Sequence, residues 1–248
     1  MLEVLDHGAI RELRLARPPV NALDPTLIAR LSQELQAAVD SQRSAVVLSG
    51  QPGLFSAGID VRAIAALDRD TLRPFVHEFF ALQQQLAHSS VPIICAITGH
   101  CPAGGTVLAL YADRRIMARG AFDIGLNEVQ IGLYPGEIIH RAFARLVGPR
   151  VASDLLPRGA LIRPDEALRV GLVDELAEPK HVVGRALEYA RELAELPQAV
   201  YRRTRALVRA DLIRLFDAPS EDFAAVFTEQ WFSAEARTRL AGLLKGAK

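Results

Sequence analysis

The sequence predicts one large α/β domain followed by a helical C-terminal region. Half of its 248 residues are hydrophobic, enough for a sizeable core. Short apolar runs typical of buried parallel strands alternate with amphipathic helical segments through most of the chain. From about Pro179 onwards the pattern is almost entirely helical and rich in arginine. We therefore divide the chain into a core over residues 1–195 and a helical region over 196–248, which would pack on the core or on a neighbouring subunit.

The first elements follow from periodicity and capping. Residues 10–15 alternate apolar and charged side chains, as a half-buried strand does. Asp24 is followed by Pro25, a pair typical of an N-cap and the first helical position. Apolar residues then recur at helical spacing over 27–39, which predicts an amphipathic helix.

The same two patterns then repeat. The apolar runs at 45–48 and 92–98 predict buried parallel strands, and 116–118 is a third, shorter candidate. Residues 71–88 between them have the apolar spacing of a helix, and a helical segment also follows Ala103. Strand and helix thus alternate as in an α/β domain.

The overall charge argues against a general nucleic-acid binder. Acidic and basic residues number 29 each, whereas phosphate-backbone contacts require a basic face. A small phosphorylated ligand stays possible, since it needs only a few local cations.

Cysteine usage and the N-terminus indicate a reduced cytoplasmic protein. Cys95 and Cys101 lie in an apolar stretch, and no second pair completes a zinc site. The first six residues lack the cationic start and apolar run of a signal peptide. The apolar run at 93–97 is far too short to cross a bilayer, so we expect no membrane association.

Two glycine-containing turns each follow a predicted buried strand. The first is 53–61, GLFSAGIDV, and the second is 98–107, TGHCPAGGTV. Such turns can leave backbone N–H groups unpaired at the start of a helix, where they stabilise an oxyanion. Each alone is also compatible with an ordinary strand-to-helix turn. Neither has the spaced glycines of a dinucleotide fingerprint or the lysine of a P-loop. Two of them could converge on one oxygen, as an oxyanion hole requires.

Glu128 is the candidate acid/base. It lies among apolar residues and glycines in IGLNEVQIGL, residues 124–133. Apolar surroundings disfavour the charged carboxylate and raise its pKa, which suits proton transfer. An exposed glutamate on a surface turn is the alternative interpretation.

Together these segments resemble the crotonase, or enoyl-CoA hydratase/isomerase, superfamily. The resemblance rests on PPVNAL at 18–23, FSAGID at 55–60, and AITG at 96–99 followed by CPAGG at 101–105. It extends from about Arg17 to the C-terminal helices. Within the superfamily, CPAGG and IGLNE look most like the mitochondrial-type Δ3,Δ2-enoyl-CoA isomerase.

The resemblance implies a crotonase-type spiral of β-β-α turns that binds acyl-coenzyme A thioesters. It implies that residues 196–248 serve in oligomerisation, as a homotrimer or a dimer of trimers. The backbone N–H groups of Ile59 and Gly104 would form the oxyanion hole. The Ala57 carbonyl would meet the adenine, and Arg62 would lie near the phosphates unless it is an ordinary surface arginine. Further substrate contacts would come from Gly58, Gly105 and Tyr134.

The resemblance also implies a choice among activities. Hydratases of the family carry two catalytic glutamates, one at the position of Glu128 and one three residues past the glycine donor. The latter position is Val107 here, which cannot transfer a proton. We therefore expect isomerisation of 3-enoyl-CoA to 2-trans-enoyl-CoA by Glu128 alone, with no metal or redox cofactor. The alternatives are a hydratase or other crotonase reaction, and a non-catalytic acyl-CoA-binding subunit.

Two further features stay open in the sequence. The segment YPGE at 134–137 is more hydratase-like than isomerase-like, and it belongs to the region that lines the family's acyl pocket. Glu137 is a possible second acid or the first-turn glutamate of a helix.

A basic helical run is expected to be a solvated face, part of which could meet coenzyme A phosphates; its members are Arg202, Arg203, Arg205, Arg209 and Arg214.

Overall fold

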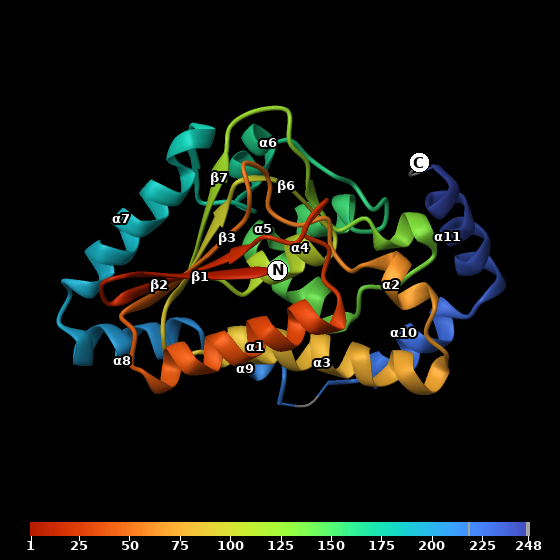
Figure 1. Cartoon of the computed structure of the whole chain (residues 1–248), viewed down its shortest axis with the longest axis horizontal. Coiled ribbons are helices and arrows are strands. Elements are labelled where there is room, and N and C mark those ends of the chain that lie inside the picture. Colours follow the sequence, from red (N-terminus) through yellow and green to blue (C-terminus); the bar gives the residue numbers. More distant parts are fainter. Residues whose placement is uncertain (218, 247–248) are drawn as a thin grey trace.

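The computed structural model describes residues 1–217 and 219–246 (Figure 1). The strands are β1 Leu2–His7, β2 Ile10–Leu15, β3 Ala45–Ser49, β4 Gly53–Leu54, β5 Ile93–Ile97, β6 Gly99–Pro102, β7 Arg114–Ala118, β8 Ile124–Gly125 and β9 Glu175–Ala177. The α-helices are α1 Pro25–Asp40, α2 Val61–Ala65, α3 Arg69–His88, α4 Gly104–Leu110, α5 Glu137–Leu155, α6 Pro164–Val170, α7 Val182–Ala194, α8 Gln198–Val208, α9 Ala210–Arg214, α10 Phe223–Trp231 and α11 Ala234–Gly246. Two short 3-10 helices are η1 Glu128–Ile131 and η2 Pro179–His181.

The main sheet has six strands in the order β1-β2-β3-β5-β7-β9. All neighbours are parallel except β1 and β2, which form an antiparallel hairpin. The predicted strands at 10–15, 45–48, 92–98 and 116–118 are thus confirmed as β2, β3, β5 and β7. The sequence pattern does not predict β1, because its residues do not alternate cleanly between apolar and polar.

A second sheet of short parallel strands, in the order β4-β6-β8, stacks successive turns of the chain. Each of β3, β5 and β7 continues into one of these strands and then into a helix, which makes the spiral of β-β-α turns that the family resemblance implied. The stacking is close. A Cβ on Gly99 would lie 1.9 Å from the carbonyl carbon of Gly53, so only glycine fits there.

Helices cover both faces of the main sheet. On one face, α7 packs against β3, β5 and β7, through an apolar cluster that includes Val47, Ile94 and Leu187. On the other, α1 and α3 run side by side beneath the larger core cluster (Figure 1). The predicted N-cap of α1 is confirmed, because the Asp24 carboxylate accepts a hydrogen bond from the Leu27 N–H at 2.8 Å.

The C-terminal helices are fixed to the core by buried arginines. Arg205 makes two hydrogen bonds to the Asp113 carboxylate, at 2.7 and 2.8 Å, and a third to the Ser89 carbonyl. Arg209 is 5% exposed and donates to the carbonyls of Leu86, Ala87 and Tyr111. The expectation of a solvated basic face is therefore wrong for these two residues. The helical spacing of the arginines could not reveal that Asp113 and several helix-end carbonyls lie opposite them.

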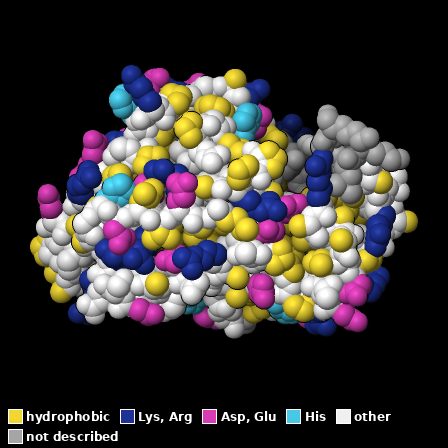
Figure 2. Space-filling view, in the orientation of Figure 1, with side chains coloured by type: hydrophobic (Ala, Val, Ile, Leu, Met, Phe, Trp, Pro, Cys, Tyr) yellow, Lys and Arg dark blue, Asp and Glu magenta, His cyan; other side chains and the backbone are white. Residues whose placement is uncertain are grey.

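Both cysteines are buried free thiols, as expected of packing residues, and burial raises the pKa of the Cys95 thiol to about 12. In the part of the chain that the structure describes, no helix is long and apolar enough to span a membrane. The same residues contain no group of three or more His, Cys, Asp or Glu side chains that could hold a metal ion. Figure 2 shows acidic and basic side chains interspersed over one face, in keeping with their equal numbers.

Candidate active site

The first glycine turn is held by buried hydrogen bonds. The Ser56 hydroxyl donates to the Asn21 carbonyl at 2.7 Å and accepts from the Gly58 N–H at 3.1 Å. The Asn21 side chain donates to the Phe55 carbonyl at 3.0 Å. Gly58 has a φ of +89°, a conformation that glycine adopts without strain. These contacts turn the chain so that the next backbone N–H, that of Ile59, is left out of the network.

The second turn leads into α4. Ala103, its N-cap, has a φ of +51°, which is rare for a residue with a side chain. The buried Thr106 hydroxyl bonds the carbonyls of Cys101 and Gly125 and accepts from the Gly125 N–H at 2.9 Å. The first turn of α4 is thereby tied to β6 and β8. Gly104 begins α4, so its N–H has no acceptor within the helix.

The two turns bring their unpaired donors together. A Cβ on Gly104 would lie 3.1 Å from the Ile59 nitrogen, and a Cβ on Gly58 would lie 2.9 Å from the Gly104 nitrogen. Within the described residues, neither the Ile59 nor the Gly104 N–H donates a hydrogen bond. Two neighbouring free N–H groups are the geometry that stabilises a developing oxyanion.

The donors border a cavity of about 160 Å³, which we call the thioester cavity. Apart from Asn127 and Glu128, its walls are formed by apolar or small residues. They comprise Ala57, Ile59, Val61, Ile64, Pro102, Ala103, Gly104, Asn127, Glu128, Ile131, Leu133, Phe227 and Trp231. Among these described residues, Glu128 is the one ionisable side chain.

Glu128 begins η1, at the end of the polypeptide segment that follows β8. Its carboxylate oxygen Oε2 is buried and has no hydrogen-bond partner in the described chain. Burial raises the pKa of Glu128 to about 7, because a charged carboxylate is poorly solvated there. The interpretation of an exposed surface glutamate is therefore wrong. A carboxyl that titrates near neutrality can both take and return a proton.

The two other candidate positions for an acid are accounted for. Val107 is 1% exposed and belongs to the apolar core. Glu137 is the first residue of α5, where its carboxylate bonds Ser220 and pairs with Arg141, and it lines neither cavity that contains Glu128. These contacts hold the pKa of Glu137 below its ordinary value. The helix-terminus interpretation of Glu137 is thus confirmed.

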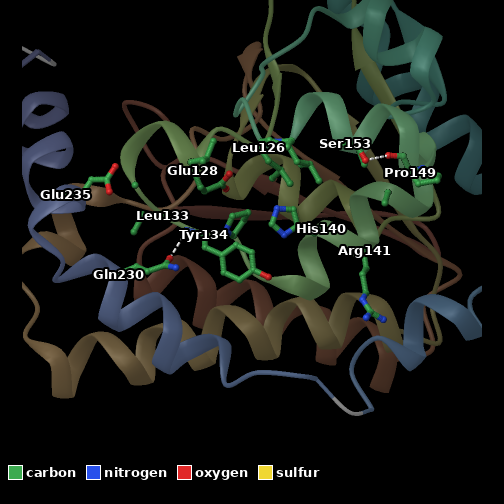
Figure 3. Close-up of a pocket in the computed structure, with 17 residues that line it drawn as sticks. Leu126, Glu128, Leu133, Tyr134, His140, Arg141, Pro149, Ser153, Gln230 and Glu235 are labelled. Carbon is green, nitrogen blue, oxygen red and sulfur yellow. Dashed lines mark hydrogen bonds between the residues drawn. The ribbon is translucent and has the colours of Figure 1, made fainter.

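A second cavity of about 690 Å³ adjoins the first (Figure 3). Glu128 and Leu133 line both, so the candidate base lies at their boundary. The walls of the second cavity come from η1, from α5 on both sides of its kink at Gly148, and from the C-terminal helices. We call it the acyl cavity. Tyr134 and His140 lie side by side in its wall, with ring centroids 5.1 Å apart.

The remaining predicted substrate contacts lie in different places. Ala57 lines the thioester cavity and Tyr134 the acyl cavity. Gly58 and Gly105 line neither, and instead lie where the two turns pack together; a Cβ on Gly105 would be 2.6 Å from the Ser56 carbonyl oxygen. Arg62 is exposed on α2, outside both walls. Its role toward phosphates stays a prediction.

Helix α10 contributes a wall of the site that the sequence does not predict. Phe227 and Trp231 close the thioester cavity with stacked rings 6.1 Å apart, and Gln230 lines the acyl cavity. Helix α10 is held in place by packing on α3. The aromatic spacing 223, 227, 231 predicts one apolar helix face, but nothing in the sequence says which cavity that face covers.

Known proteins resemble this chain over most of its length. The family model described as "Enoyl-CoA hydratase/isomerase" matches residues 6–239. The human mitochondrial enoyl-CoA delta isomerase 1 is 29% identical over 232 residues, which cover 90% of this chain and 77% of that protein. The human peroxisomal bifunctional enzyme is 35% identical over 192 residues, or 77% of this chain. The matched part is only 26% of that longer protein.

Solved structures show the same architecture. Human mitochondrial delta3-delta2-enoyl-CoA isomerase superposes with a TM-score of 0.91 at 28% identity, covering 99% of this chain and 97% of that one. An enoyl-CoA hydratase/isomerase from Pseudoalteromonas atlantica T6c gives a TM-score of 0.88 at 25% identity, covering 100% and 98%. The fold, the paired donors and the family match lead to one conclusion: the chain belongs to the enoyl-CoA hydratase/isomerase, or crotonase, family.

Proposed function

We propose that the protein isomerises 3-enoyl-CoA thioesters to 2-trans-enoyl-CoA through Glu128. One observation carries the proposal: Glu128 is the single ionisable side chain among the described residues of the thioester cavity, and it lies there with two free backbone donors. The similarity to enoyl-CoA delta isomerase 1 supports the same reaction.

The proposed reaction moves one proton and one double bond. The ionised Glu128 removes a proton from C2 of the acyl chain, and negative charge develops on the thioester oxygen. The N–H groups of Ile59 and Gly104 stabilise that oxygen; loss of one such donor typically costs about 2.7–4 kcal/mol of barrier. The electron pair shifts to form the C2=C3 bond as C3=C4 is lost, and Glu128 returns its proton to C4.

The position of Val107 favours isomerisation over hydration. Hydration needs a base for the attacking water and an acid for C2. Val107 occupies the position of the second glutamate, and it is buried in the core. Glu137, the other candidate, is bound to Ser220 and Arg141 away from the cavity.

The wider proposal concerns substrate handling and assembly. Coenzyme A enters as part of the substrate, with its adenine at the Ala57 carbonyl and its phosphates near Arg62. The proton transfer itself needs no metal or redox cofactor. We further propose a homotrimer or a dimer of trimers, assembled through residues 196–248, in the cytoplasm. Light scattering of the purified chain tests the assembly.

The decisive assay follows the absorbance of the conjugated enoyl thioester. Purified protein is incubated with 3-cis-hexenoyl-CoA, 3-trans-hexenoyl-CoA and, separately, crotonyl-CoA. We expect absorbance to appear from the 3-enoyl substrates and to stay constant with crotonyl-CoA. Loss of crotonyl-CoA absorbance would instead establish a hydratase. No change with any of the three, despite measurable acyl-CoA binding, would favour the non-catalytic subunit and overturn the proposal.

A further inference from the structure

Of the described residues, Glu128 and Leu133 are the two that line both the thioester cavity and the acyl cavity. Figure 3 shows both of them in the wall of the acyl cavity. The thioester cavity, at about 160 Å³, has room for roughly five groups the size of a water molecule, about what a thioester and the first carbons of its acyl chain fill. A longer acyl chain must therefore continue past these two residues into the acyl cavity.

The backbone around Leu133 is held at three successive residues. Gly132 packs against α11, because a Cβ on this glycine would lie 3.2 Å from the backbone of that helix. The Leu133 N–H donates to the Glu128 carbonyl at 3.1 Å, and the Tyr134 N–H donates to the Gln230 side-chain oxygen at 2.7 Å. The Leu133 side chain is buried, and interiors are close-packed, so its volume sets the width of the boundary between the cavities.

Much of the acyl cavity wall suits a hydrocarbon chain. The Ser153 hydroxyl in this wall donates to the Pro149 carbonyl at 2.8 Å, as the dashed line in Figure 3 shows, and Arg141 pairs with Glu137 at 2.5 Å. These two polar side chains therefore have protein partners. Each methylene that enters the cavity leaves water, which favours longer chains. The apolar side chains of the wall include Leu126, Val129, Ala144, Ala152 and Leu156.

We propose that Leu133 is a specificity-determining residue, which admits straight acyl chains to the acyl cavity and excludes chains with a branch at C5. The inference rests on the proposed function, in which Glu128 exchanges a proton with C2 and C4. The next carbon, C5, then passes Leu133, the other residue at the boundary. A methyl branch on that carbon adds width where a fixed side chain already fills the space, and such overpacking costs binding affinity.

Binding measured without turnover tests this specificity. Calorimetry compares butanoyl-, hexanoyl-, 5-methylhexanoyl- and decanoyl-CoA, none of which has a double bond to isomerise. Decanoyl-CoA should bind at least about tenfold more tightly than butanoyl-CoA, because its tail reaches the acyl cavity. 5-Methylhexanoyl-CoA should bind about tenfold more weakly than hexanoyl-CoA although it is the more hydrophobic of the two, because its branch meets Leu133.

Variants identify the residue responsible. Leu133→Ala widens the boundary, so 5-methylhexanoyl-CoA should bind this variant at least as tightly as hexanoyl-CoA does. Leu133→Phe narrows the boundary and should remove the advantage of decanoyl-CoA over butanoyl-CoA. The control is Leu156→Ala, which shortens a leucine that lines the acyl cavity but not the boundary, and it should retain the tenfold rejection of the branched chain.

The same rejection of the branched chain in Leu133→Ala as in the unmodified protein would overturn the proposal. Tighter binding of 5-methylhexanoyl-CoA than of hexanoyl-CoA by the unmodified protein would also overturn it, as would a decanoyl-CoA advantage that survives in Leu133→Phe. Failure of the isomerase proposal would look different. It would appear as absent turnover of 3-hexenoyl-CoA while the preference for straight chains in binding remained.

Discussion

The thioester cavity and the acyl cavity share Glu128 but are built differently. The first, of about 160 Å³, has its donors in the backbone, at two turns fixed by buried hydroxyl and amide hydrogen bonds. The second, of about 690 Å³, takes its polar character from side chains of η1, α5, α10 and α11 and from Tyr134. Backbone donors persist through many side-chain substitutions, whereas side-chain walls change with each one. Substitutions in the cavity walls should therefore leave the backbone donors in place, whereas they should change which acyl groups the second cavity accepts.

The largest expected effect is at the shared residue. Glu128→Gln should lower turnover of 3-hexenoyl-CoA by about 10²- to 10⁴-fold, the usual contribution of a positioned acid/base group. Binding of a saturated acyl-CoA should be retained, because the amide keeps the shape of the side chain. Glu235→Gln changes a carboxylate at the exposed rim of the acyl cavity and should have little effect on turnover. Full activity of Glu128→Gln would exclude the mechanism.

The backbone donors come next. In Gly104→Ala, the new Cβ would lie 3.1 Å from the Ile59 nitrogen, in the space meant for the thioester oxygen. We expect kcat to fall by about 10²- to 10³-fold, as on loss of one oxyanion donor, and Gly104→Val should be at least as impaired. The control is Gly184→Ala, where a Cβ meets nothing within 4 Å. Normal kinetics in folded Gly104→Ala would show that the oxyanion lies elsewhere.

The pH dependence of kcat/KM and of stability reports the pKa of Glu128. Because burial raises the pKa of Glu128 to about 7, kcat/KM should rise about tenfold per pH unit below pH 7 and level off above it. The folded state retains this proton to higher pH than the unfolded state does. The free energy of unfolding should therefore lose a contribution as pH rises from about 4.5 to 7, and Glu128→Gln should remove that loss. A rate profile that is flat from pH 5 to 8 would contradict the assignment.

The smallest effect concerns the support of the second turn. Thr106→Val keeps the shape of a fully buried side chain but removes the hydroxyl that bonds Cys101 and Gly125. We expect a loss of about 1–3 kcal/mol in the free energy of unfolding, the cost of leaving buried polar groups unpaired. Denaturant titration measures the loss, and kcat should drop only severalfold. Unchanged stability would mean that α4 does not depend on this hydroxyl.

The sequence predicted what is determined locally. The strands over 45–48 and 92–98, the capped helix at Asp24–Pro25 and the two glycine turns all appear as expected, because each depends on neighbouring residues. The identity of Glu128 as the buried carboxylate was one of two open interpretations, and apolar neighbours in sequence could not decide it. The short helix η1, which Glu128 begins, packs against the distant helix α11 through Gly132 and Ala236, a contact that the local sequence does not reveal.

What depends on tertiary contacts could not be predicted. The spacing of Phe227 and Trp231 predicts an apolar helix face. The packing of α10 on α3 determines that this face lines the thioester cavity. From its spacing, Arg209 is expected to be one of several solvated arginines. In the folded protein, Asp113 and three helix-end carbonyls surround its side chain. Its burial lowers the pKa of Arg209 to about 10.

The contribution of α10 to the thioester cavity also has a consequence for biosynthesis. Ile59, Gly104 and Glu128 all precede α10 in the chain, and Phe227 and Trp231 of α10 complete the wall of the cavity that these three residues line. A nascent chain, or one cut by a protease before that helix, holds these three residues but lacks the aromatic wall. Closure of the thioester cavity therefore waits until α10 has been translated and has packed on α3.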